Sequence, residues 1–447
     1  MTDLREIVDR GPMRGFQYLA VLVCILLNMI DGFDVLVMAF TAASVSREWG
    51  LSGAQVGLLL SAGLVGMAAG SLLLAPLADR WGRRRLILVC LLLSGSGMLL
   101  SALAGSPLQL ALLRGLTGLG VGGVLASSNV IASEYSARRW RGLAVSLQGM
   151  GYALGATLGG LLAVWLLSHW GWRAVFGAGG LITLGALPLV LLGLPESLDF
   201  LLTRRPFGAL VQVNRLARRL GQPELAALPP QVASPSAAGT VGRLLAPALR
   251  RTTLLVWTLF FLAMFGFYFI MSWTPKLLTT LGLSEQQGVA GGVLLSVGGI
   301  FGAALVGLLF ARLPLSRALG GFMLTTALLL VAFAHMGSSY LGALAMGLLI
   351  GLFANGCVAG LYALPALAYA AEVRATGVGW GIGIGRLGAI LSPVVAGLLL
   401  DNGWPPLRLY LVFAGVFVAA GLLLLLTRPE GRPTSAGLSV SAGKALG

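Results

Sequence analysis

The sequence predicts an all-α integral membrane protein with twelve transmembrane helices in two six-helix halves. Hydrophobic residues make up 57% of the 447 residues, charged residues make up only 10%, and the mean hydropathy is +0.92. A soluble domain carries about 25% charged residues, because its surface must face water. The 65 glycines are about twice the usual share, as expected where helices in a bilayer pack closely on small residues. The chain is therefore expected to fold in a lipid bilayer.

Apolar segments long enough to span a bilayer, which takes about 20 residues, occur twelve times. They are residues 17–40, 54–78, 85–105, 107–132, 143–168, 172–194, 252–275, 287–311, 316–336, 339–365, 376–400 and 407–427. The loops between them are short except for residues 195–251, which are polar and rich in proline near their centre. We expect this stretch to be a cytoplasmic linker between an N-terminal half, residues 1–194, and a C-terminal half, residues 252–447, which ends in a short cytoplasmic tail.

The distribution of basic residues predicts the orientation in the membrane. If the N-terminus is cytoplasmic, the cytoplasmic segments hold 24 of the 30 basic residues and the opposite face holds four. The other two, Arg114 and Arg386, lie within spans. Since cytoplasmic loops carry an excess of Lys and Arg, both termini are expected in the cytoplasm. The net charge of +15 does not indicate nucleic-acid binding, because the basic residues form short runs between apolar segments and no basic groove with interleaved aromatics is evident.

The two halves resemble each other in sequence. Glu134 is followed by Y-S-A-R-R-W-R-G, and Glu372 by V-R-A-T-G. In both halves a G-x-(x)-L-G-A step follows about a dozen residues later, so the pattern recurs after the fourth and tenth spans. Like-oriented repeats of this kind are typical of secondary transporters that bind substrate between the halves near the bilayer midplane.

Two acidic residues, Asp31 and Asp34, interrupt the first span in the sequence N-M-I-D-G-F-D-V. With Asn28 they are spaced by three, so on a helix the three residues share one face. A charge at the bilayer centre costs on the order of 2.5–3.5 kcal/mol on insertion scales. The carboxylates are therefore expected to face an internal cavity, to pair with a cation or to be protonated, which suits a proton carrier. The alternative is a structural ion pair or a hydrogen bond between helices.

Polar side chains in other spans are candidates for a substrate site. Arg386 is expected to bind a substrate carboxylate, because its planar guanidinium can donate two hydrogen bonds at once, or alternatively to form an ion pair that packs helices. Arg114 is expected to belong to a proton-linked or structural network. Asn28 and several aromatic residues are further candidates, with packing or interface anchoring as the alternative for the aromatics: Tyr152, Phe265, Tyr268, Trp273, Tyr362 and Trp380.

No enzyme signature is present in the sequence. There is no G-x-S-x-G motif, no P-loop and no cluster of metal ligands, and the three cysteines lie far apart within apolar segments. We therefore expect a protein that is not an enzyme and that needs no cofactor or metal. Without a nucleotide site, its energy source is expected to be an ion gradient.

Residues 75–84, A-P-L-A-D-R-W-G-R-R, resemble the G-x-x-x-D-R-x-G-R-R signature of the major facilitator superfamily, with Ala75 in place of the first glycine. The resemblance implies the major facilitator fold and a cytoplasmic charge lock that opens as the halves rock. The residues assigned to this charge network and to gating are Asp79, Arg80, Gly82, Arg83, Arg84, Arg114, Glu134, Arg141, Glu372 and Arg374.

Three further motifs resemble the aromatic acid:proton symporter family. They are D-G-F-D in the first span, L-P-E-S after the sixth, and R-A-T-G-V-G-W-G-I-G-I-G-R-L-G-A-I-L-S-P leading into the eleventh. The resemblance implies proton-coupled import of benzoate, hydroxybenzoate or muconate-type carboxylates, with Asp31 and Asp34 required for transport. The expected partners are an organic anion, a proton and the lipid bilayer of a bacterial-type inner membrane, and the expected functional unit is a monomer.

Alternatives to this function remain open from the sequence. One is a proton-driven exporter, or a porter for a neutral solute such as a sugar, of the same superfamily. Another is a membrane chemoreceptor that senses aromatic acids without transporting them. The longest loop is only a polar linker, whereas a receptor usually needs a soluble signalling partner domain.

Overall fold

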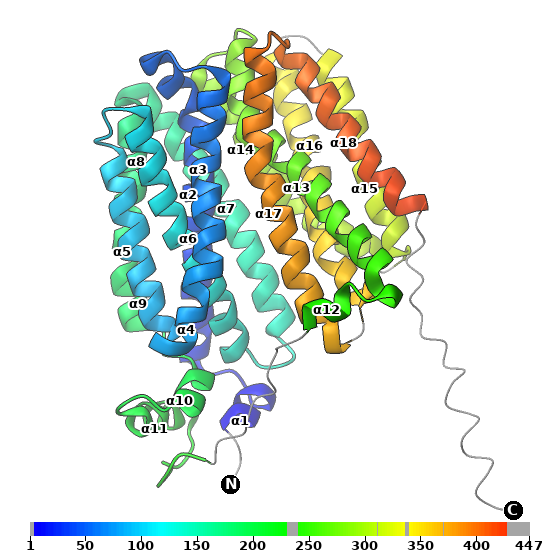
Figure 1. The fold of residues 1–447 in the computed structure, drawn as a ribbon. Helices are drawn as coiled ribbons and strands as arrows, with labels where there is room; N and C mark the ends of the chain where they lie inside the picture. Colours follow the sequence, from blue (N-terminus) through cyan, green and yellow to red (C-terminus); the bar gives the residue numbers. More distant parts are fainter. Residues whose placement is uncertain (1–3, 230–239, 311, 336–338, 370, 427–447) are drawn as a thin grey trace, which may run out of the picture.

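The computed structural model describes residues 4–229, 240–310, 312–335, 339–369 and 371–426, and within these ranges the regular structure is helical throughout (Figure 1). In this part of the chain twelve segments are long and apolar enough to cross a membrane, which confirms the predicted fold class. The helices that form them are α2 (Gly15–Trp49), α3 to α4 (Gly53–Trp81), α5 (Arg83–Ser101), α6 (Pro107–Tyr135), α7 (Arg141–His169), α8 (Gly171–Gly185) with α9 (Leu187–Gly193), α13 (Pro247–Thr280), α14 (Glu285–Phe310), α15 (Leu315–His335), α16 (Tyr340–Ala368), α17 (Ala371–Asp401) and α18 (Pro406–Leu426).

Two of the twelve segments are interrupted near a proline. In the second, α3 (Gly53–Ala69) passes through a π-helical turn, η1 (Gly70–Leu74), into α4 (Ala75–Trp81), whose first turn contains Pro76. In the sixth, Ala186 separates α8 from α9, and the first turn of α9 contains a proline. Proline lacks the backbone N–H that an α-helix would use, so the hydrogen-bond ladder must rearrange at these positions.

The helices form two bundles that stand side by side, α2–α9 and α13–α18 (Figure 1). The seam between them is made by α2, α3 and α7 of the first bundle and by α13, α14 and α17 of the second. Six membrane-length segments precede the predicted linker and six follow it. One boundary differs from the sequence prediction: α13 begins at Pro247, inside the stretch expected to be linker.

The linker is more structured than its polar composition indicates. It contains α10 (Leu198–Arg204), α11 (Ala209–Leu220) and α12 (Thr240–Leu244). Figure 1 shows α10 and α11 below the first bundle, close to α1 (Leu4–Arg10), and α12 below the second. We call this end of the molecule the linker face. Residues 230–239 of the linker and the predicted cytoplasmic tail at 427–447 lie outside the described residues.

Glycines allow the helices within a bundle to approach very closely. A Cβ atom on Gly118 of α6 would lie 2.0 Å from the backbone oxygen of Gly63 on α3, and the equivalent crossing of α14 and α16 uses Gly351. In the same way, a Cβ on Gly32 would lie 2.0 Å from the backbone oxygen of Tyr152. Helix α2 therefore packs directly on α7 at the position between the two aspartates, as expected for small residues at helix crossings in membranes.

Candidate functional site

The two aspartates of α2 lie buried in the middle of the molecule. Asp31 is 2% exposed and Asp34 is 1% exposed. Among the described residues, Oδ2 of Asp31 and both carboxylate oxygens of Asp34 have no hydrogen-bond partner. A buried, ionised carboxylate without partners is costly, so these groups need water, a ligand or a proton to complete them.

Arg114 of α6 lies directly beside Asp34. Its Nη2 atom donates to the backbone oxygen of Asp34 at 2.6 Å, and its guanidinium lies 5.8 Å from the ring centroid of Phe176. Its Nε and Nη1 atoms are buried and have no hydrogen-bond partner in the described structure. A cavity of about 10 Å³, room for about one water, is lined by Asp34 and Arg114. Arg114 therefore places a positive charge near Asp34, and in the described structure both carboxylate oxygens of Asp34 stay without a hydrogen-bond partner.

Asn28, one turn before Asp31, is already engaged within the first bundle. Its side-chain amide donates to the backbone oxygen of Cys24 at 3.0 Å and to the hydroxyl of Ser128 on α6 at 3.4 Å. The buried Gln148 of α7 donates to the backbone oxygen of the same serine at 3.4 Å. These contacts give Asn28 a role in joining α2 to α6, in addition to the predicted substrate contact.

Both bundles contribute polar groups around Tyr152 of α7. The groups within electrostatic range of its side chain are Asp31 of α2, Tyr268 of α13, Tyr362 of α16 and Arg386 of α17. Tyr362 is 45% exposed, and its ring meets that of the fully buried Phe260 edge-on at 5.9 Å. The structure therefore places Asp31, the predicted arginine and two of the predicted tyrosines within electrostatic range of Tyr152, and these five residues come from five different helices.

The polar group of one substrate candidate, Trp273, is already hydrogen-bonded within the second bundle. Trp273 is 0% exposed, and its indole N–H donates to the backbone oxygen of Pro393 at 3.1 Å. It therefore packs α13 on α17 within the second bundle. These contacts favour the packing alternative for Trp273, and its role at the substrate site stays a prediction.

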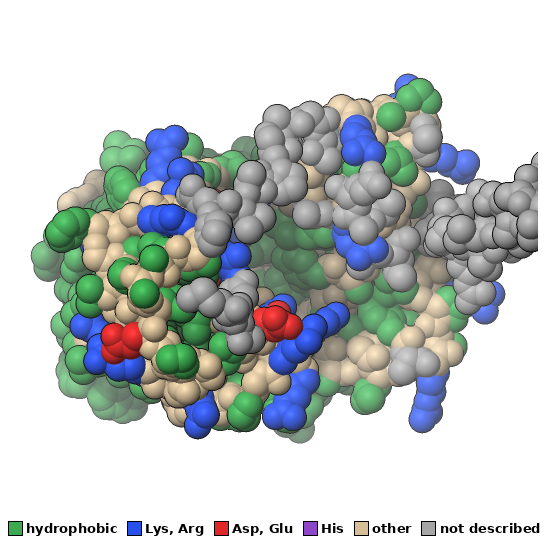
Figure 2. Space-filling model, turned by 90° about the horizontal axis from the view of Figure 1, so that it is seen from below, with side chains coloured by type: hydrophobic (Ala, Val, Ile, Leu, Met, Phe, Trp, Pro, Cys, Tyr) green, Lys and Arg blue, Asp and Glu red, His purple; other side chains and the backbone are tan. Residues whose placement is uncertain are grey.

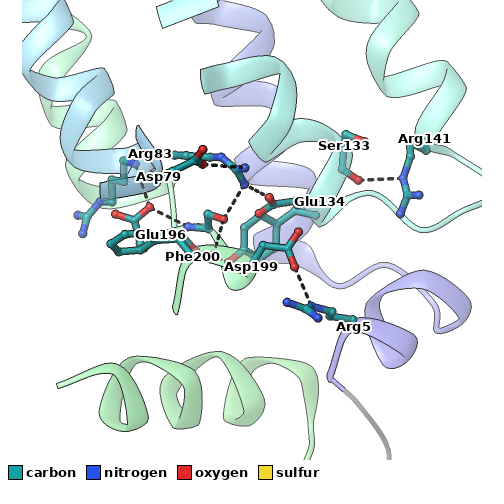
Figure 3. Close-up of polar contacts among 12 residues, drawn as sticks. Arg5, Asp79, Arg83, Ser133, Glu134, Arg141, Glu196, Asp199 and Phe200 are labelled. Carbon is teal, nitrogen blue, oxygen red and sulfur yellow. Dashed lines mark hydrogen bonds and ion pairs between the residues drawn. The ribbon is translucent and has the colours of Figure 1, made fainter. Parts of the chain in front are cut away.

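The predicted charge network lies at the linker face (Figure 3). Arg83 bonds to the carboxylate of Glu134 and, at 2.8 Å, to the hydroxyl of Ser197 at the start of α10. The ion pair of Asp79 is with Arg83 at 3.8 Å, in the same bundle. Figure 3 also shows Arg141 donating to the backbone oxygen of Ser133. Among the described residues the network thus joins the first bundle to the linker, and none of the ion pairs it forms there links the two bundles.

Glycine is required at position 82 of this network. Gly82 has φ of 98°, and a Cβ there would lie 2.5 Å from the Glu196 carboxylate. Oε1 of Glu196 accepts the backbone N–H groups of Arg84 at 3.0 Å and of Ser197 at 2.9 Å. The turn between α4 and α5 is therefore held against the start of the linker by a carboxylate.

The other predicted network residues are placed less centrally. Arg80 is exposed at the end of α4. Arg374 is exposed on α17, and its Nε donates to the backbone oxygen of Tyr369 at 3.4 Å. Glu372 is the second residue of the same helix, and its side chain lies outside the described residues.

At the face opposite the linker the two bundles are bonded to each other. Glu285 of α14 pairs with Arg47 of α2 and accepts a hydrogen bond from Ser44 at 2.8 Å. Lys276 of α13 donates to the hydroxyl of Ser46 on α2 at 2.6 Å. We call these contacts, together with Asp401, the latch.

Asp401 closes the latch between α17 and α3. Its carboxylate accepts the backbone N–H groups of Gly53 at 2.5 Å and of Ala54 at 2.8 Å, at the first turn of α3. A carboxylate is stabilised at a helix N-terminus by the unpaired N–H groups and the helix dipole. At the linker face, by contrast, Figure 2 shows the molecule hollowed between the two halves. The described contacts across the seam thus join the two bundles at the end opposite the linker face.

The family comparison agrees with this architecture. Residues 21–380 match the model of the Major Facilitator Superfamily, which is well over half of the chain. The chain belongs to the Major Facilitator Superfamily. It is therefore a membrane transporter and not an enzyme, and the resemblance seen at residues 75–84 is confirmed.

Among the superfamily's characterised members, relatives match this chain over nearly its whole length. A gallate transporter of Pseudomonas putida is 35% identical over 94% of this chain and 94% of that protein. The 4-hydroxybenzoate transporter PcaK of Acinetobacter baylyi is 31% identical over 90% of this chain and 89% of that protein. A benzoate transport protein of Acinetobacter baylyi is 26% identical over 90% of this chain and 88% of that protein.

Solved structures of superfamily transporters share the fold. A D-xylose–proton symporter superposes with a TM-score of 0.72 at 18% identity, covering 94% of this chain and 100% of that chain. A partially occluded, inward-open conformation of the xylose transporter XylE from E. coli gives a TM-score of 0.70 at 17% identity, covering 92% and 97%.

Several residues that bond neighbouring helices in this transporter were not predicted from the sequence. Glu285, Lys276 and Asp401 lie at span ends, where a charge is ordinarily a topology signal, so nothing in the sequence marked them as partners across the seam. Gln148 had a usable signal, because a buried amide inside a membrane helix is rare and points to function or to a packing bond.

Proposed function

We propose that this transporter carries an aromatic carboxylate together with a proton into the cell by alternating access. The observation that carries the proposal is the convergence of unpartnered carboxylates from the first bundle and a guanidinium from the second. Asp31 and Arg386 both lie within electrostatic range of Tyr152. Relatives named for gallate, 4-hydroxybenzoate and benzoate support an aromatic acid as the substrate.

The proposed proton site is the pair Asp31 and Asp34. Three of their four carboxylate oxygens are buried without a partner in the described structure, so a bound proton removes the cost of enclosing an ionised group. The two groups are close enough in the helix to interact, and we expect them to titrate as a pair. Arg114 holds the backbone of Asp34 and keeps a positive charge nearby.

The proposed substrate anchor is Arg386. A guanidinium binds a carboxylate through two parallel hydrogen bonds, which fixes the orientation of the acid. The hydroxyls of Tyr152, Tyr268 and Tyr362 then face the aromatic ring and can exchange hydrogen bonds with its substituents. The edge of Phe260 beside Tyr362 supplies an apolar surface for the ring itself.

The latch and the linker-face network are proposed to alternate. In this structure the latch is formed and the hollow faces the linker. Opening the opposite face requires the latch contacts of Glu285 and Asp401 to break, while Asp79 and Arg83 approach the second bundle. One proton moving with one monoanion is electroneutral, so the pH gradient rather than the voltage drives accumulation.

The placement of the chain in the membrane is part of the proposal. The linker face is assigned to the cytoplasm, with both termini there, because that side carries 24 of the 30 basic residues. The membrane is proposed to be a bacterial-type inner membrane, as in the relatives' hosts. Because one chain contains both bundles and the whole site, the functional unit is proposed to be a monomer.

Transport into liposomes tests the proposal. Purified protein is reconstituted, and uptake of labelled 4-hydroxybenzoate is followed with the lumen alkaline, with no gradient, and with a voltage alone. Accumulation that requires the pH gradient supports symport. Competition by neutral sugars but not by carboxylates would instead favour a neutral-solute porter, and binding without flux would favour a receptor.

A further inference from the structure

A crevice separate from the transport site lies at the linker face, between α11 and the ends of α5 and α9. Its volume is about 470 Å³, and its lining includes three arginines, Arg84 and Arg85 of α5 and Arg215 of α11. A second cavity of about 110 Å³ shares Arg84 and Arg215 and also reaches Arg219. A basic crevice of this size is large enough for a phosphate-sized headgroup.

The positive charge of the crevice is poorly compensated. In the described part of the chain none of the three guanidinium groups that line the larger crevice forms an ion pair. Arg84 instead donates from Nη2 to the backbone oxygen of Leu191 at 2.6 Å, and its buried Nε has no partner. The single lining carboxylate, Glu196, accepts backbone N–H groups through Oε1. Three guanidinium groups against one carboxylate leave an excess of positive charge that suits an anion.

One wall of the crevice is apolar and faces outward at the end of a membrane span. Leu191 is 51% exposed and Leu192 is 83% exposed, next to the end of the span at Gly193. Both line the smaller cavity. Exposed leucines beside the arginines would make no favourable contact with a small soluble anion. They can contact the acyl chains of a lipid, because these continue into the hydrocarbon region.

The linker helix α11 has the composition of a segment that lies on a membrane surface. Val213, Leu216 and Leu220 are buried against the protein. On the outside, Val211 is 62% exposed, and Phe207 in the preceding turn is fully exposed. Exposed apolar residues on the same segment as exposed arginines are typical of interfacial helices that bind anionic lipid. Figure 2 shows further basic side chains grouped on this face of the molecule.

We propose that the crevice binds the headgroup of an anionic phospholipid, with the acyl chains over Leu191 and Leu192. The phosphate is held by Arg84, Arg85 and Arg215, since guanidinium groups bind phosphate oxygens in pairs. Because Arg215 belongs to the linker and the other two to the first bundle, the lipid fastens α11 onto α5 and α9. This role is independent of the substrate and of proton coupling.

Lipid titration followed by native mass spectrometry tests the site. The full-length protein in detergent is titrated with phosphatidylglycerol and, separately, with phosphatidylcholine. We expect tight binding of one phosphatidylglycerol and no comparable binding of phosphatidylcholine. A surface arginine contributes roughly a 5-fold change in affinity, so Arg85→Ala should weaken binding by about 5-fold, and Arg85→Ala with Arg215→Ala by about 30-fold. Arg85→Lys, which keeps the charge, should retain most of the binding.

The matched control is Arg138→Ala with Arg139→Ala, which removes two exposed arginines from the same face outside the crevice. It should bind phosphatidylglycerol like the unmodified protein. Equal losses in the control and the crevice variant would overturn the proposal, because binding would then follow total charge. Equal binding of the two lipids would also overturn it. Displacement of the lipid by inorganic phosphate at equal concentration would assign the site to a soluble anion instead.

Discussion

Arg114 donates a hydrogen bond from Nη2 to the backbone carbonyl oxygen of Asp34, at a distance of 2.6 Å. The guanidinium thus fixes the position of α2 and places a charge beside a carboxylate that it does not occupy. A carboxylate held in this way can exchange a proton without losing the bond that positions it. This relationship connects the packing of α2 and α6 with the proposed proton site.

Replacing Arg114 therefore tests whether this residue positions Asp34 and whether its charge stabilises the Asp34 carboxylate. Arg114→Gln leaves Asp34 without its neighbouring cation, and uptake should fall at least about 10-fold, because a buried charge that loses its partner is destabilised by several kcal/mol. Arg114→Lys keeps the charge and should retain clearly more uptake. Initial rates across a pH series are the measurement. A glutamine variant with unchanged rate and pH profile would show that Arg114 is only a packing residue.

Replacing Arg386 tests the assignment of the substrate carboxylate. Hydrogen bonds to charged groups are worth about 1.5–3 kcal/mol, so Arg386→Gln should raise the KM for benzoate-type acids roughly 10- to 100-fold. The unmodified protein should be inhibited by benzoate and hardly by the neutral benzamide. The variant should lose this preference. If Arg386→Gln still discriminates the two compounds as strongly, the carboxylate binds elsewhere.

The latch predicts a shift between the inward-facing and outward-facing states. Glu285→Gln removes the ion pair with Arg47, and the partly exposed pair is worth about 0.5–1 kcal/mol, so the population ratio should move roughly 2- to 5-fold toward the outward-open state. Spin labels on cysteines introduced at the exposed Leu103 and Trp404, one in each bundle, report the opening by electron–electron distance measurements.

Glu48→Gln is the matched control for the latch. Glu48 lies near the same face, but its bonds to Trp172 and Arg173 stay within the first bundle. Its distance distribution should match that of the unmodified protein. Identical distributions for both variants would remove Glu285 from the gating mechanism.

The close crossing of α2 and α7 predicts an intolerant glycine. A Cβ on Gly155 would lie 1.8 Å from the backbone oxygen of Met29, so Gly155→Ala should lower the thermal midpoint by several degrees, as overpacking typically costs about 1–3 kcal/mol. On the same helix, a Cβ atom on Gly149 would have none of the described neighbouring atoms within 4 Å. Gly149→Ala should leave the midpoint unchanged or raise it slightly. Comparable losses in the two variants would contradict the packing.

Much of the fold follows from the sequence, because membrane spans depend on local composition. The predicted span at 54–78 corresponds to Gly53–Trp81, and that at 376–400 to Thr376–Asp401. The π-helical turn at Gly70–Leu74 was not predicted, since it depends on how the hydrogen-bond ladder relaxes before Pro76. The helices of the linker were hidden by its polar composition.

The candidate site could be predicted only in part. The acids stood out because a carboxylate in an apolar span is costly, whereas Trp273 and Tyr362 are the same kind of residue in sequence and differ only in their surroundings. The latch depends on which span ends meet across the seam. Asp401 caps α3 at Gly53, 348 residues earlier in the chain, and no local pattern indicates that pairing.

Proton coupling through the α2 aspartates is the central claim, and gradient-driven accumulation measures it most directly. Proteoliposomes holding the unmodified protein, Asp31→Asn or Asp34→Asn are loaded at alkaline internal pH, and the concentration ratio of labelled 4-hydroxybenzoate is followed to steady state. The unmodified protein should concentrate the acid in proportion to the pH gradient. Each asparagine variant should fail to concentrate it. Accumulation that ignores the gradient, or an Asp31→Asn variant that still concentrates the acid, would contradict the account.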